Sequence, residues 1–267
     1  FWESLLGLGQ FYSVQASTDV RPISGSYVNR NHFAGLLEMA LPLALAWAIA
    51  SWGNATRRDQ RSAGAAVQTA ILLGISACML AGVVGSLSRM GFAATLTGIA
   101  MVAIGWLIAR NHQSRVPRWL WLLPILLPLG IILFVSSNAM VLRFADGLGA
   151  GEVTASGRTE IWKETLRLIG AYHWTGTGLG AYQQGLYPFR LVIPAMTVDF
   201  AHNDYLQAFA ELGLVGGALA LALAIWILWR PLSLVLRPHS KHWALCAGLL
   251  GSFVAIGLHS LADFNLY

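Results

Sequence analysis

Charged residues are scarce in this sequence. Asp, Glu, Lys and Arg make up 11% of its 267 residues, while 56% are hydrophobic. Soluble domains carry roughly 25% charged residues, so the composition excludes an ordinary soluble protein. Cysteine is scarce too: Cys78 and Cys246 both lie within apolar runs. We expect them to be small buried hydrophobes, without a disulfide or metal framework.

The positive charge forms no continuous patch. A net charge of +5 would suit a nucleic acid, but the basic residues are dispersed between apolar runs and form no single stripe. The histidines are equally scattered, and no cluster of histidines and carboxylates has metal-ligand spacing. We therefore predict no nucleic-acid partner, no metal and no cofactor.

Long apolar segments are abundant, and a spanning helix needs about 20 mainly apolar residues. Six stretches qualify, at roughly 33–52, 65–87, 91–109, 119–137, 209–229 and 243–261. The predicted fold class is therefore all-α, a polytopic transmembrane helix bundle forming one integral-membrane domain over 1–267. Because the chain opens on Phe1 and stops just after a polar turn, we expect it to be a fragment with further spans missing.

Short basic loops predict the orientation of the bundle. Three of them, Gly53–Ala63, Arg110–Arg118 and Arg230–His242, hold nine of the 17 basic residues. Alternation of the helices puts all three on one side, and the positive-inside rule makes that side the cytoplasm. The long loop, 138–208, then faces outward.

The polar stretch from Asn138 to Glu211 holds seven of the twelve carboxylates, so we expect the chemistry there. From Arg158 to Tyr172 the apolar positions follow helical spacing, which predicts a helix lying on the outer membrane surface with its apolar face down. The opposite face would carry Glu160, Lys163, Glu164 and Arg167. A flexible turn should follow, marked by Gly176, Gly178, Gly180 and Gly185.

Two arginines are candidate anion-binding residues. Arg89 lies in a short outward turn between apolar runs, where positive charge is normally excluded. Arg158 falls at the N-terminus of the predicted loop helix, where the helix dipole favours an anion. The structural alternatives are an interfacial arginine that snorkels and a solvated loop arginine.

Three histidines have different predicted roles. His202 precedes the fifth span, where the helix dipole favours a neutral imidazole that can accept a proton from a hydroxyl; a structural hydrogen bond to a loop carbonyl is the alternative. His259 lies four residues before Asp263, which favours an oriented pair at a helix end. His173, beside Trp174, is expected to be an interfacial anchor.

The start of the first span carries further candidates. Glu38 lies about one and a half turns into this span, and ionisable groups inside a membrane are functional candidates. Its alternative role is to pair with a nearby arginine and order the bundle. Pro42 removes the hydrogen bond to the Glu38 carbonyl, so neighbouring groups must satisfy the freed backbone. Arg30 and His32 either bind substrate or anchor the helix end.

Taken in order, these motifs resemble the O-antigen ligase and polymerase superfamily of the Wzy_C type. The resemblance covers about residues 25–267. The matching stretches are Tyr27–Gly35, Ser88–Gly91, Gly157–Trp162, Gly176–Gly180, His202–Gln207, Glu211–Gly213 and His259–Asn265.

The resemblance implies a metal-independent glycosyltransferase of the bacterial inner membrane with a periplasmic active site. Its donor would be a glycan on undecaprenyl diphosphate, and its acceptor a hydroxyl of a lipid A-core sugar, a glycan or a protein. Arg89 and Arg158 match the arginines that hold the diphosphate, and His202 matches the loop histidine near the acceptor. These three are the predicted catalytic residues. The predicted substrate-binding residues are Arg30, His32, Glu38, Asn203, Asp204 and His259.

Residue chemistry agrees with this assignment. The diphosphate is already a good leaving group, so catalysis mainly needs positive charge that stabilises it, and direct attack by the acceptor would invert the anomeric centre. Two other classes stay open. One is a membrane transporter for a small anion or inorganic carbon, and the other is a non-catalytic partner in envelope assembly.

Overall fold

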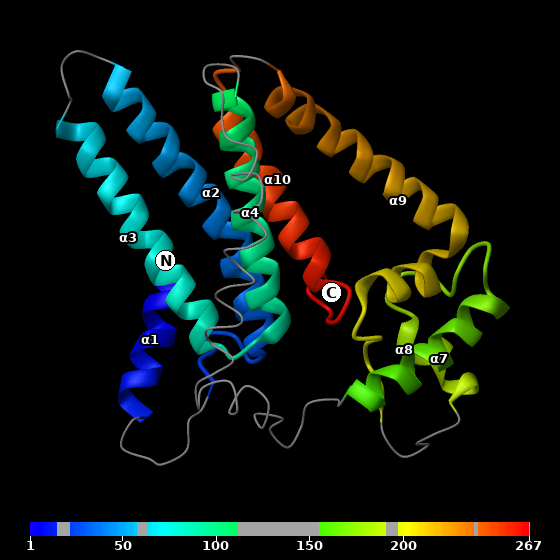
Figure 1. Ribbon diagram of the computed structural model, residues 1–267. Helices are drawn as coiled ribbons and strands as arrows, with labels where there is room; N and C mark the ends of the chain where they lie inside the picture. The colour runs from blue at the N-terminus through cyan, green and yellow to red at the C-terminus, as the bar shows by residue number, and fades with distance from the viewer. Residues whose placement is uncertain (15–21, 58–62, 112–154, 191–196, 238–239, 267) are drawn as a thin grey trace. The chain divides into compact units, whose positions relative to one another are not determined.

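A computed structural model describes residues 1–14, 22–57, 63–111, 155–190, 197–237 and 240–266 (Figure 1). All regular secondary structure in these ranges is helical, which confirms the predicted all-α class for this part of the chain. The predicted fourth span, 119–137, lies outside the described residues. The elements are α1 (Trp2–Val14), α2 (Arg30–Arg57), α3 (Ala63–Gly85), α4 (Arg89–Asn111), α7 (Ala155–Ala171), α8 (Tyr182–Leu186), the 3-10 turn η2 (Tyr187–Phe189), α9 (Asp204–Leu236) and α10 (Trp243–His259).

Four of the helices are long and apolar enough to cross a membrane. These segments are Arg30–Gly53 in α2, Ala63–Gly85 in α3, Arg89–Ala109 in α4 and Asp204–Leu236 in α9. They cover the predicted spans 33–52, 65–87, 91–109 and 209–229. The predicted span 243–261 corresponds to α10, which has 17 residues. It is therefore roughly 25 Å long, less than the about 30 Å of a hydrocarbon core.

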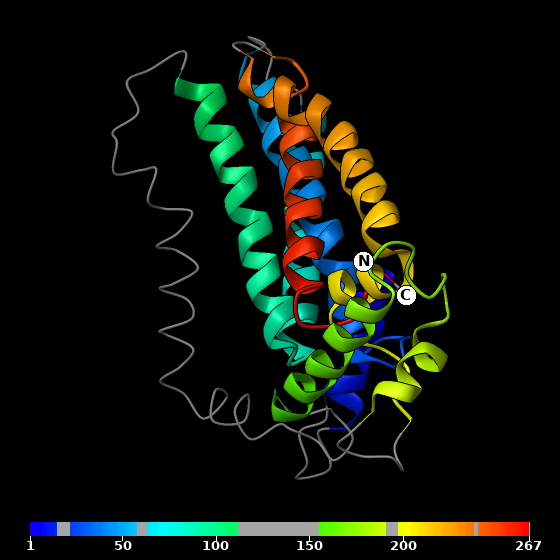
Figure 2. The same ribbon diagram turned by 90° about the vertical axis from the view of Figure 1, so that its right-hand side faces the viewer.

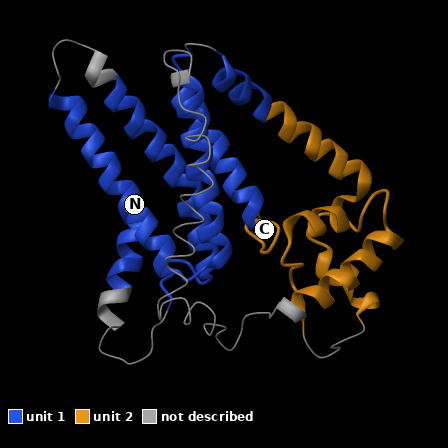
Figure 3. Ribbon diagram, viewed as in Figure 1, with its two compact units in different colours: residues 1–146, 228–259 blue, residues 147–227, 260–267 orange. Residues whose placement is uncertain are grey.

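The chain forms two compact units, shown in different colours in Figure 3. Unit 1 comprises Phe1–Asp146 and Leu228–His259, and unit 2 comprises Gly147–Ile227 and Ser260–Tyr267. The spanning helices α2, α3 and α4 and the helix α10 belong to unit 1. Unit 2 holds α7, α8, η2 and most of α9.

Small residues bring the helices of unit 1 close together. In both views α10 runs beside α2 and α4 (Figures 1 and 2). A Cβ atom on Gly98 of α4 would lie 2.8 Å from Cγ of Pro42 and 3.1 Å from the carbonyl oxygen of Gly251. Such close approach through glycine is how membrane helices gain packing contacts where lipid offers no hydrophobic driving force. α2, α4 and α10 therefore form the centre of unit 1.

A neighbouring helix donates to the backbone of α2 close to Pro42. Pro42 lies inside α2. The Ser252 hydroxyl of α10 donates to the carbonyl oxygen of Met39 at 2.5 Å and also to that of Gly248 at 3.0 Å. The hydroxyl reaches the carbonyl next to that of Glu38, which is the one Pro42 frees, so satisfaction of the Glu38 carbonyl itself stays a prediction.

The predicted loop helix exists as α7, but its apolar face does not lie on a membrane. Leu168 is fully buried with Tyr182, Leu186, Ala201 and Ala210 in the core of unit 2. The apolar face is thus covered by the unit's own residues, so the prediction that this face is turned to the membrane is wrong, while a position of the helix at the membrane surface stays a prediction. Glu164, predicted on the polar face, is also buried. Its Oε2 lies 3.9 Å from Nε of Arg190.

The glycine-rich segment after α7 is held in place, so the prediction of a flexible turn is wrong. Backbone hydrogen bonds run from Thr177 and Gly178 to the carbonyls of Ala210 and Glu211, and from Leu214 and Val215 to those of His173 and Trp174. They meet at Gly213, whose backbone (φ +63°, ψ −170°) breaks the helical run of α9. A Cβ there would lie 2.5 Å from the Trp174 carbonyl oxygen. Gly185 lies inside α8.

Candidate functional site

His202 occupies a strained position just before α9 begins. Its φ of +50° is in the left-handed region, which few residues other than glycine adopt, although histidine is among those enriched there. Its Nδ1 lies 3.4 Å from Oδ1 of Asp263. The imidazole is 19% exposed and the carboxylate 3%. A ring that solvent can reach is thereby held against a buried carboxylate.

Asp263 is stabilised as a carboxylate. Burial raises the pKa of Asp263, but the hydrogen bond with His202, the Phe264 backbone N–H and the charge of Arg158 together bring the pKa below its ordinary value. The Phe264 N–H donates to Oδ1 at 2.9 Å. With an ionised carboxylate as its neighbour, we assign the His202 proton to Nδ1. The other ring nitrogen, Nε2, makes no hydrogen bond within the described residues.

Arg158 lies in the first turn of α7, which begins at Ala155, as the sequence predicted. Its side chain is partly exposed, and its charge acts on Asp263. Its buried Nε has no hydrogen-bond partner within the described residues. Unit 2 thus brings together Arg158, His202 and Asp263, of which the sequence predicted the first two as catalytic.

Asn203 and Asp204, predicted to bind substrate, make structural contacts in unit 2. Asn203 accepts from the Leu206 N–H at 3.0 Å and donates to the Leu261 carbonyl at 2.9 Å. Asp204 Oδ2 accepts from the Ser260 hydroxyl at 2.7 Å and from the Asn265 N–H at 3.1 Å. These contacts fix the segment around His202 to the segment that carries Asp263. Asp204 Oδ1 is buried and has no partner in the described chain.

Aromatic rings adjoin the imidazole. The His202 and Phe264 rings are T-shaped, with centroids 4.9 Å apart. Phe264 in turn stacks on Phe200 at 4.2 Å, with an interplanar angle of 6°. The stack limits the orientations open to the imidazole ring.

The other candidates lie in unit 1. Nδ1 of His259 is 2.9 and 3.1 Å from the two carboxylate oxygens of Glu38, and both side chains are fully buried. The predicted pairing of His259 with Asp263 is wrong, because each has a different partner. α10 ends at His259, so the helical spacing on which that pairing rested does not continue. Glu38 likewise pairs with a histidine and not with the arginine that the sequence suggested.

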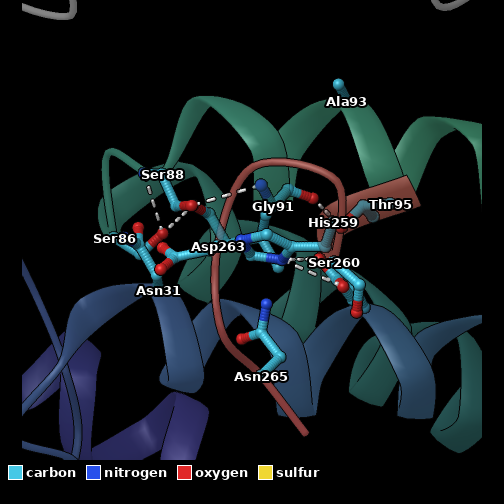
Figure 4. A network of polar contacts seen from close by, with 12 residues as sticks. Asn31, Ser86, Ser88, Gly91, Ala93, Thr95, His259, Ser260, Asp263 and Asn265 are labelled. Carbon is cyan, nitrogen blue, oxygen red and sulfur yellow. Dashed lines mark hydrogen bonds and ion pairs between the residues drawn. The ribbon is translucent and has the colours of Figure 1, made fainter. Parts of the chain in front are cut away.

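Arg89 is exposed at the first residue of α4. The preceding Ser88 caps this helix, since its hydroxyl oxygen accepts from the Gly91 N–H at 3.1 Å. The Ser86 hydroxyl oxygen in turn accepts from the Ser88 N–H at 3.2 Å (Figure 4). Arg30 and His32 lie in the first turn of α2. Whether these residues share one membrane face with those of unit 2 stays a prediction.

Sequence reasoning missed the role of Asp263 toward His202. These residues are 61 positions apart, and no local spacing links them. The available signal was that both fell within polar motifs predicted to face outward. Within the described residues, no three His, Cys, Asp or Glu side chains converge in a way that could hold a metal ion.

A family model described as O-antigen ligase, Wzy_C, matches residues 74–221, more than half of the chain. The matched region includes Arg89, Arg158 and His202, whereas Glu38 and His259 lie outside it. No curated protein matches the sequence. The chain belongs to the O-antigen ligase family.

Proposed function

We propose that this protein transfers a glycan from undecaprenyl diphosphate to an acceptor hydroxyl at the periplasmic face of the bacterial inner membrane. The acceptor is a lipid A-core sugar, a glycan or a protein. The family supports the reaction class, and one observation carries the mechanism. His202 presents an Nε2 that bonds to none of the residues that the structure describes, while a buried carboxylate faces its Nδ1.

In this mechanism His202 is the general base. The acceptor hydroxyl gives its proton to Nε2 as its oxygen attacks the anomeric carbon of the donor sugar. Asp263 keeps the ring oriented and stabilises the imidazolium that forms, as a carboxylate does in a catalytic triad. The bond between the anomeric carbon and the diphosphate oxygen breaks as this attack proceeds. Because the acceptor oxygen displaces the diphosphate directly, the anomeric configuration inverts.

Arginines stabilise the departing diphosphate. The guanidinium stays charged and meets phosphate oxygens in a fixed fork, which supplies the needed charge without a metal. Arg158 and Arg89 each lie in the first turn of a helix, where the helix dipole also favours an anion. We assign them to the diphosphate, with Arg30, in the first turn of α2, as a further contact.

The test is transfer in vitro from undecaprenyl-diphosphate glycan by the purified protein in detergent or nanodiscs. His202→Ala should lose about 10²–10⁴-fold in transfer and still bind donor. The matched control is His173→Ala, because His173 is exposed and its Nδ1 faces the Gly170 carbonyl at 3.2 Å.

Either of two results would remove His202 from acceptor activation, namely normal transfer by His202→Ala or loss of donor binding. A wild-type protein that moves anions across vesicles but transfers no glycan would support the transporter alternative. A protein with neither activity would support a partner in envelope assembly.

A further inference from the structure

The left-handed backbone of His202 has to be imposed by its surroundings. For residues other than glycine this conformation is strained, and strained residues persist when neighbouring structure over-determines them. His202 has a φ of +50°. The hydrogen bonds of the residues before and after His202 show what holds its backbone in this conformation.

Both backbone polar groups of the preceding residue, Ala201, are bonded by side chains. The Trp162 indole Nε1–H of α7 donates to the Ala201 carbonyl at 2.9 Å. On the other side the Ala201 N–H donates to Oε1 of Gln207 at 3.0 Å. Ala201 is fully buried and Gln207 is 2% exposed, so water does not compete for these bonds.

The residues that follow His202 are fixed as well. Asn203 bonds to the Leu206 N–H and the Leu261 carbonyl, and the Asp204 N–H donates to the Ser260 carbonyl at 2.9 Å. Because Ala201 and Asn203 are both fixed, the backbone torsions of this short segment that could still vary are the φ and ψ of His202. The direction in which the His202 side chain leaves the backbone is therefore set by hydrogen bonds that His202 does not itself make.

We propose that Trp162 and Gln207 are positioning residues that hold the Ala201 backbone so that the His202 imidazole meets Asp263. The proposal rests on the proposed function, in which His202 is the base. Trp162 follows Arg158 by four residues on α7, so both lie on one face of that helix. One rigid helix therefore carries the guanidinium assigned to the diphosphate and the indole that fixes the base. α7 thereby sets the spacing between leaving group and base.

The test removes each hydrogen bond and keeps an aromatic ring at position 162 and a side chain of similar length at position 207. Trp162→Phe loses the donor and Gln207→Met loses the acceptor. Each should lower kcat about 10- to 100-fold, since small misplacements of reacting groups cost about 10²-fold, while KM for the donor stays within about twofold. The same substitutions at exposed positions of unit 2, Trp174→Phe and Gln183→Met, should leave transfer unchanged.

A double-mutant cycle separates positioning from a merely structural role. If Trp162 acts through His202, adding Trp162→Phe to His202→Ala should cost less than about twofold more. Multiplicative losses would overturn the proposal, as would wild-type kcat in both single variants. The two variants release the same backbone from opposite sides, so Gln207→Met decides the question if Trp162→Phe does not fold. If Trp162→Phe transfers glycan normally while the separate variant His202→Ala is inactive, the positioning role is refuted and the proposed function is still supported.

Discussion

Replacing Asp263 by asparagine tests the partnership on which the proposed mechanism depends. Asparagine keeps an oxygen that can accept from the Phe264 N–H, which donates to Oδ1 of Asp263 at 2.9 Å. It removes the negative charge that faces Nδ1 of His202 and Arg158. The substitution therefore changes the electrostatics of the pair while preserving volume and the local turn.

The size of the effect follows from the geometry. A hydrogen bond to a charged group is worth about 1.5–3 kcal/mol, which corresponds to about 10- to 150-fold in rate at about 1.4 kcal/mol per factor of ten. The Nδ1–Oδ1 distance of 3.4 Å is long, which points to the lower part of this range. Asp263→Asn should thus lose about 10- to 40-fold in kcat, less than His202→Ala.

The assay is single-turnover transfer from saturating undecaprenyl-diphosphate glycan. Asp199→Asn is the matched control, because Asp199 is exposed in the same unit and accepts from Gln183 Nε2 at 2.8 Å. Transfer by Asp263→Asn within about twofold of wild type would refute the orienting role. A loss larger than that of His202→Ala would show that Asp263 acts by a route other than His202.

Asp263 also predicts how stability depends on pH. Its folded-state pKa is lowered, so its contribution to stability is fully present above the unfolded value of about 3.9. That contribution is lost as pH falls through the folded-state pKa. Thermal unfolding of the purified protein below about pH 5 should therefore be less pH-dependent in Asp263→Asn than in wild type. Equal acid sensitivity of the two proteins would contradict the assigned electrostatics.

Three further predictions concern binding, the buried pair and topology. Arg158→Lys keeps the charge but loses the fork, so transfer should fall sharply with normal membrane insertion; unchanged transfer would exclude bidentate phosphate recognition. Glu38→Leu and His259→Leu should each destabilise the protein by about 3–5 kcal/mol in thermal unfolding, with most of the loss recovered in the double variant; additive losses would contradict pairing. Reporter fusions after Asn111 and near Ala150 should read cytoplasmic and periplasmic, and a periplasmic signal at Asn111 would overturn the predicted common face.

Much of the helical architecture was predictable because it depends on local composition. Runs of about 20 apolar residues are required to cross a hydrocarbon core, so the spans in α2, α3 and α4 follow from hydropathy. The start of α9 did not. Its first residues include Asp204, Gln207 and Glu211, which are polar and buried, so apolar counting does not detect them, and Gly213 then breaks the helical run.

The site was predictable in its residue types and not in its pairings. Polar motifs at helix starts identified Arg158 and His202 from the sequence. Spacing along one helix then suggested His259 with Asp263, but the actual partners are 221 and 61 positions apart in the chain. Such pairings depend on tertiary packing, which brings α2 to α10 in unit 1 and the segment around His202 to the C-terminal segment in unit 2.

The two histidine–carboxylate pairs share a chemistry but differ in ways that assign them different roles. His259 and Glu38 are fully buried and 2.9 Å apart, so no substrate reaches them in this conformation, and the bundle-ordering role left open for Glu38 is favoured. His202 and Asp263 are more loosely spaced, the ring is 19% exposed, and its backbone is strained. Exposure, an Nε2 without a partner among the described residues, and backbone strain are expected of a base that must meet a mobile acceptor. Of these two histidines, only His202 should therefore react with a histidine-modifying reagent. Faster modification of His259 than of His202 would reverse the assignment.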